Sequence, residues 1–132
     1  MNNTVVLCVA LLVVFYGALS LNVSRLRRKR RRDSTVTEAT LTKAIRAHGN
    51  AAEYIPLFVA GLLYLNSVAP SHFVVGLAVA TVVCRLMHAA GILLVPAVSE
   101  PHPLRFVGAL GTYFCLFALG GALIVHWFQG GA

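Results

Sequence analysis

Four long apolar stretches dominate this chain and limit the structures that it can adopt. Each has about the 20 residues that an α-helix needs to cross a hydrocarbon core about 30 Å thick. The expected spans are residues 4–21, 47–67, 72–95 and 104–127. Hydrophobic residues make up 58% of the chain, more than a soluble domain of this size can bury. We therefore expect one all-α integral membrane domain over residues 1–132, a bundle of four transmembrane helices.

Basic residues determine the expected orientation. Seven of the 11 Lys and Arg residues lie in residues 25–32, directly after the first span, whereas the turn at residues 66–71 has none. By the positive-inside rule, the basic loop at residues 25–35 is cytoplasmic and both termini lie outside the cell (inner) membrane. The loop is also expected to contact anionic membrane lipid. Nucleic-acid binding is not expected, because neither interleaved aromatic residues nor a recognition helix accompanies the basic run.

The second span carries an unusual polar stripe. A capping-box spacing at residues 35–38 predicts that its helix begins near Val36, well before the apolar run. Arg46, Asn50 and Glu53 are spaced four and three apart, so they share one face of that helix. Each polar group in hydrocarbon costs about a few kcal/mol unless it faces protein or ligand. The stripe therefore predicts a face that is buried or lined by ligand.

Further charges of the third and fourth spans fall near this stripe. Arg85 and His88 are three apart and share a helix face, and Arg85 lies at nearly the same depth as Glu53, about 20 Å from the outer surface. We expect Glu53 and Arg85 to meet, directly or through ligand or water, because otherwise each charge would face lipid alone. Arg105, near the start of the fourth span, adds a cation at the cytoplasmic edge.

The charge pattern allows two interpretations. The excess of Arg suits a ligand with several carboxylates, and Glu53 suits an ammonium group on the same ligand, as in a zwitterionic acidic peptide. Alternatively, Glu53 and Arg85 only neutralise each other, and Arg46 and Arg105 extend to the lipid headgroups. The scattered Cys and His residues suggest neither a disulfide framework nor a metal site.

Three motifs resemble those of the MAPEG family, the membrane-associated proteins in eicosanoid and glutathione metabolism. The segment Arg46-Ala-His-Gly-Asn-Ala-Ala-Glu-Tyr-Ile-Pro56 resembles the family's second-helix motif. Arg-Leu-Met-His at residues 85–88 resembles its third-helix motif, and Pro-Leu-Arg at residues 103–105 resembles its entry to the fourth helix. The chain is most similar to small bacterial members. The resemblance implies a homotrimer of four-helix subunits that holds glutathione, its co-substrate, between neighbouring subunits.

The resemblance also implies roles for individual residues. Arg105 matches the arginine that faces the glutathione sulfur, where a nearby cation favours the thiolate by lowering the thiol pKa from about 8.5. Glutathione-binding positions of the family fall on Arg27, Arg46, Asn50, Glu53, Tyr54, Arg85 and His88.

Two departures from the family pattern shape the expected function. Ile92 stands where active eicosanoid relatives have Tyr, and Phe106 stands where the prostaglandin-synthesising branch has Ser, so eicosanoid synthesis is not expected. A glutathione-dependent transferase or peroxidase for lipophilic electrophiles needs only a thiolate and an apolar partner, and is the expected activity. The alternatives are a non-catalytic trimer that binds glutathione or lipid, and a small multidrug-type transporter. The transporter requires an acid on the first helix, which residues 4–21 lack.

Overall fold

The computed structural model describes residues 1–130 and consists of four long helices. In chain order they are α1 (Asn3–Arg30), α2 (Glu38–Val68), α3 (His72–Leu93) and α4 (Pro103–Phe128). All four are long and apolar enough to cross a membrane, and no strand occurs in the described part of the chain. The expected all-α membrane bundle is therefore confirmed.

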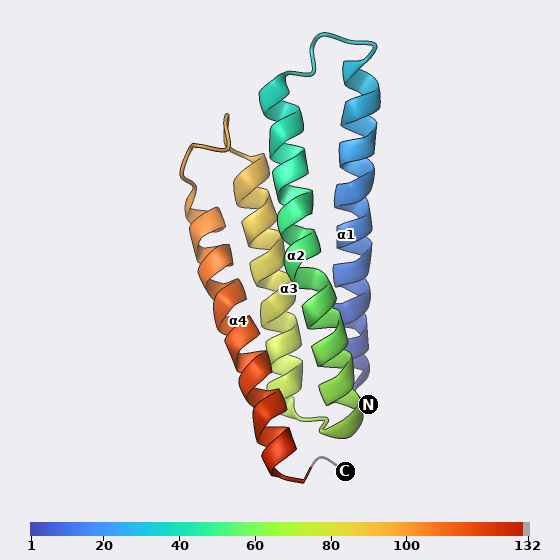
Figure 1. Cartoon of the computed structure of the whole chain (residues 1–132), viewed down its shortest axis with the longest axis vertical. Helices are drawn as coiled ribbons and strands as arrows, with labels where there is room; N and C mark the ends of the chain where they lie inside the picture. The colour runs from blue at the N-terminus through green and yellow to red at the C-terminus, as the bar shows by residue number, and fades with distance from the viewer. Residues whose placement is uncertain (131–132) are drawn as a thin grey trace.

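The helices run side by side, so their connections gather at two ends (Figure 1). The α1–α2 and α3–α4 connections lie at one end, which we call the basic end because it carries the Lys and Arg run. The start of α1, the α2–α3 turn and the end of α4 lie at the other. This arrangement agrees with a chain that crosses the membrane four times.

Two helix boundaries differ from the prediction. The basic run continues α1 through Arg30 instead of forming a loop, because Arg and Lys are good helix formers and suit the last turn of a helix. Helix α2 begins at Glu38 rather than near Val36. Its N-cap is Thr37, whose hydroxyl oxygen accepts a hydrogen bond from the Thr40 N–H at 3.2 Å. Both helices therefore project beyond their apolar segments at the basic end.

The core lies along the centre of the bundle, where α1 packs on α2, α3 packs on α4, and α2 joins the two pairs. It is filled by large apolar side chains such as Leu12, Phe58, Leu62 and Leu119. Many other large apolar residues, including Phe117, are exposed on the outer surface. An outer surface of this kind suits hydrocarbon chains, which supports a multi-pass membrane protein.

Polar contacts tie the helices together at each end. Asn66, completely buried on α2, donates to the Asn2 carbonyl at 3.2 Å and accepts from the Asn2 N–H at 2.9 Å. At the basic end, the Lys43 ammonium donates to the carbonyls of Leu93 and Val95 at 3.2 and 2.6 Å. A cation near the last carbonyls of a helix is favourable, so Lys43 of α2 stabilises the C-terminal end of α3.

Glycines bring α3 and α4 unusually close at the basic end. A methyl group added at Gly108 would lie 2.5 Å from the backbone nitrogen of His88, and one at Gly91 would meet the backbone of Arg105. Small residues allow such close approach between membrane helices. The contact fixes His88 and Arg105 relative to each other.

Candidate functional site

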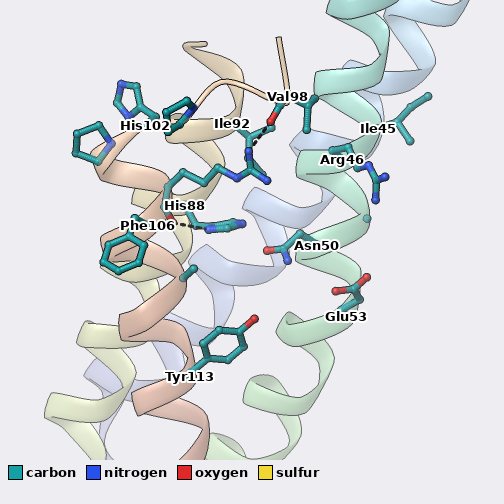
Figure 2. Close-up of a pocket in the computed structure, with 15 residues that line it drawn as sticks. Ile45, Arg46, Asn50, Glu53, His88, Ile92, Val98, His102, Phe106 and Tyr113 are labelled. Atoms are coloured by element: carbon teal, nitrogen blue, oxygen red, sulfur yellow. Dashed lines mark hydrogen bonds between the residues drawn. The ribbon is translucent and has the colours of Figure 1, made fainter.

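A groove of about 1240 Å³ opens at the basic end between α2, α3, α4 and the α3–α4 connection (Figure 2). Five of the eight predicted site residues line it: Arg46, Asn50, Glu53, His88 and Arg105. The other three, Arg27, Tyr54 and Arg85, do not. Residues far apart in the sequence are thus brought together on three helices around one opening.

The α2 wall of the groove is polar. Figure 2 shows Asn50 directed from α2 towards His88, whereas Arg46 and Glu53 lie along the outer edge of the same helix. Arg46 and Glu53 are exposed and Asn50 is half-buried. The predicted stripe therefore exists, but only its central member points towards α3. The two charged members remain available to a ligand or to another subunit.

Arg85 lies behind this wall and is only 1% exposed. One terminal nitrogen, Nη2, donates to the Asn50 side-chain oxygen at 2.6 Å, and the other, Nη1, donates to the Thr112 hydroxyl at 3.4 Å. The guanidinium carbon lies 5.2 Å from the centre of the Tyr54 ring, close enough for a cation–π contact. Arg85 thus links α2, α3 and α4 without reaching the groove.

Glu53 and Arg85 do not form a direct ion pair, and their expected contact through ligand or water stays a prediction. Within residues 1–130, neither takes part in an ion pair shorter than 4 Å. The depth estimate fixes a position along the helix axis, but the direction around the axis decides which side chain reaches Arg85. Asn50 occupies the inward direction, and Glu53 lies at the exposed edge.

His88 and Arg105 are coupled through the backbone. The His88 Nδ1 atom lies 3.0 Å from the Arg105 carbonyl oxygen. Because a carbonyl only accepts, we assign the proton of the ring to Nδ1, which leaves Nε2 as an acceptor in the neutral ring. The Arg105 side chain donates from Nη1 to the Val98 carbonyl at 2.6 Å. That contact holds the guanidinium at the groove and leaves its other N–H groups without a partner among the described residues.

The remaining wall of the groove is mainly apolar, with Ile92, Phe106 and Ala109 among its residues. Tyr113 also lines it, and Figure 2 shows its hydroxyl directed towards α2. Tyr113 is not among the residues predicted from the sequence. The sequence feature that could have identified Tyr113 is its spacing of eight residues from Arg105. Eight residues are about two helical turns, so the two side chains share a face of α4 about 12 Å apart along the axis.

Two of the predicted residues have other surroundings. Tyr54 packs edge-on against Tyr113, with ring centres 6.1 Å apart. Arg27 is exposed on α1 and lies outside the groove of its own chain. The structure therefore does not bring Arg27 together with the site residues that line the groove.

The groove combines two chemical surfaces. Arg46, Arg105 and the Asn50 amide can bind carboxylates and carbonyls, while Glu53 can bind an ammonium group. The apolar wall can accept a lipophilic molecule from the membrane. Among residues 1–130, no group of three His, Cys, Asp or Glu side chains is placed to hold a metal ion.

Comparison with known proteins identifies the family of the chain. No individual curated protein gives a significant sequence match. The model of the MAPEG family matches residues 5–125, a range that contains every residue of the groove. The chain therefore belongs to the MAPEG family, the group of membrane proteins associated with eicosanoid and glutathione metabolism.

Proposed function

We propose that this protein is a membrane-bound, glutathione-dependent transferase or peroxidase that acts on lipophilic electrophiles. One observation carries the proposal: the Arg105 guanidinium, held by the Val98 carbonyl, lies in a groove with a polar wall on α2 and an apolar wall on α4. Such a groove suits a charged thiol peptide and an apolar second substrate at once. Family membership supports glutathione as the thiol.

Glutathione carries two carboxylates, an ammonium group and two amide units, and the α2 wall offers a partner for each kind of group. Arg46 and the Asn50 amide are the donors for carboxylates and carbonyls, and Glu53 is the acceptor for the ammonium group. The free Nε2 of His88 is a further acceptor. Charge-assisted hydrogen bonds of this kind are each worth about 1.5–3 kcal/mol.

Arg105 supplies the chemical activation in this proposal. A fixed cation beside the sulfur stabilises the thiolate relative to the thiol, and the thiolate is the reactive nucleophile. In the transferase reaction the thiolate sulfur forms a bond to an electrophilic carbon, and the leaving group departs with its bonding electrons. In the peroxidase reaction two glutathione molecules are oxidised to the disulfide while a hydroperoxide is reduced to an alcohol and water.

A homotrimer in the inner membrane, with the groove open to the cytoplasm, completes the proposal. Arg46 and Glu53 are exposed at the outer edge of α2, and Arg27 is exposed on α1. Charges at membrane depth need a partner. A neighbouring subunit that brings its Arg27 to the groove would give Glu53 a partner of opposite charge and would enclose glutathione between two chains.

A non-catalytic glutathione- or lipid-binding trimer is the second candidate. Ile92 and Phe106 favour it, because they place hydrocarbon rather than hydroxyl groups near Arg105. The retained Arg105 favours the enzyme.

Rapid mixing of the purified protein with glutathione, followed by the ultraviolet absorbance of thiolate at pH 7, separates the candidates. The enzyme should produce thiolate in proportion to bound glutathione. Binding without thiolate would support the non-catalytic protein, and an absence of glutathione binding would contradict the enzyme and leave only the lipid-binding form of the second candidate.

A further inference from the structure

The geometry points to Arg85 as a positioning residue that fixes the side-chain amide of Asn50. In this arrangement the Asn50 oxygen accepts from Arg85, while its NH₂ group has no partner among the described residues and Asn50 lines the groove, so the group that it offers to a ligand is a donor. The ligand group opposite Asn50 is then a carboxylate or carbonyl oxygen and not an ammonium group. The inference deepens the proposed function and rests on it for the identity of the ligand.

The orientation of the amide follows from the contact between the two side chains. The Arg85 Nη2 atom lies 2.6 Å from the Asn50 oxygen, a short distance typical of a charge-assisted hydrogen bond. A guanidinium has five N–H donors and no acceptor. With the amide reversed, two donors would face each other at this distance. Arg85 therefore selects one of the two amide orientations.

Arg85 itself has little freedom to turn towards a ligand. It is 1% exposed, its second terminal nitrogen donates to Thr112 on α4, and its guanidinium lies over the Tyr54 ring of α2. Its Nε atom is buried without a hydrogen-bond partner. A side chain held on three sides is suited to orienting Asn50 rather than to binding glutathione directly.

The charge of Arg85 favours an anionic ligand group at Asn50. No carboxylate of residues 1–130 lies within 4 Å of this buried cation, and a buried charge without a counter-charge is costly. The cation polarises the Asn50 amide, which makes its NH₂ group a stronger donor. An anion bound to that group would partly compensate Arg85, while the exposed Glu53, three residues further along α2, remains for an ammonium group.

The decisive variant is Asn50→Asp, which keeps the shape of the side chain, gives Arg85 a carboxylate and removes the donor. The affinity for S-methylglutathione, a probe that cannot form a thiolate, should fall at least about tenfold in calorimetric titration. The midpoint of thermal unfolding without ligand should rise, because the introduced carboxylate would pair with Arg85. Unchanged affinity, or a lower midpoint, would contradict the inference.

A matched pair of variants separates positioning from general support of the fold. Arg85→Gln releases the amide of Asn50 and should weaken S-methylglutathione binding about tenfold. Thr112→Val removes the other hydrogen bond of Arg85 and leaves Asn50 in place, so its affinity should stay within about twofold of wild type. Equal losses in both variants would show that Arg85 acts only as a link between helices.

The same probe distinguishes this inference from the proposed activity. A wild-type protein that binds S-methylglutathione but forms no thiolate with glutathione would contradict the enzyme and leave the role of Arg85 intact. A wild-type protein that binds neither compound would contradict both.

Discussion

Replacing Gly108 by Ala tests whether close helix contact holds the candidate site together. The new methyl group would lie 2.5 Å from the His88 nitrogen and 2.8 Å from both the Cys84 oxygen and the His88 Cα atom. These are backbone atoms, so a change of side-chain rotamer cannot relieve the overlap and α3 and α4 must separate. Overpacking of this kind costs about 1–3 kcal/mol. Replacing Gly by Ala inside a helix also stabilises the protein by about 1 kcal/mol, because Ala has the higher helix propensity.

Gly120→Ala is the matched control, because it lies on the same helix and its added methyl group meets nothing within 4 Å. The difference in unfolding free energy between the two variants therefore isolates the overlap and should be about 1–3 kcal/mol. Denaturant unfolding in detergent micelles measures it. Gly108→Ala should also weaken glutathione binding, because separation of α3 and α4 breaks the contact between His88 and the Arg105 carbonyl. Equal stability of the two variants would refute the close contact between α3 and α4.

Further variants test the walls of the groove. Glu53→Gln and Arg46→Ala should each weaken glutathione binding by about 1.5–3 kcal/mol, because each removes a charged hydrogen-bond partner; unchanged calorimetric affinity in both would show that these charges only extend to the lipid headgroups. Tyr113→Phe should raise the KM about three- to tenfold for lipophilic electrophiles that carry a hydrogen-bond acceptor, and leave it unchanged for those without one. An equal change in KM for both classes of electrophile would assign Tyr113 a packing role.

The sequence predicted the four helices and the polar face of α2, because apolar length and helical spacing are local properties. It missed the helical extension of α1 at Arg30, since hydropathy marks only the part of a helix that lies in lipid. The N-cap of α2 is Thr37 and not the first residue of the capping-box spacing at residues 35–38. Neighbouring Thr residues are equivalent N-cap candidates, and the packing of the chain decides among them.

The contact of Arg85 with Asn50 could not be predicted from the spacing of residues along one helix. Asn50 and Glu53 are three residues apart, so their directions around the helix axis differ by about 60°. That difference places Asn50 against Arg85 and Glu53 at the exposed edge. Tyr113 was not predicted as a site residue because an aromatic residue in an apolar span is ordinarily a packing residue. Only the position of α4 beside α2 brings its hydroxyl to the groove.

The pKa of bound glutathione in wild type and in Arg105→Ala tests the central claim most directly. Removal of the cation should leave the α2 contacts of the peptide in place while the thiol pKa returns towards about 8.5, the value of a free thiol. An ultraviolet pH titration of bound glutathione measures the pKa, and conjugation of a model chloronitrobenzene measures the activity. Wild type should form thiolate near pH 7 and conjugate the probe, whereas the variant should bind glutathione but form thiolate only at higher pH. Coincident titration curves would contradict the role of Arg105.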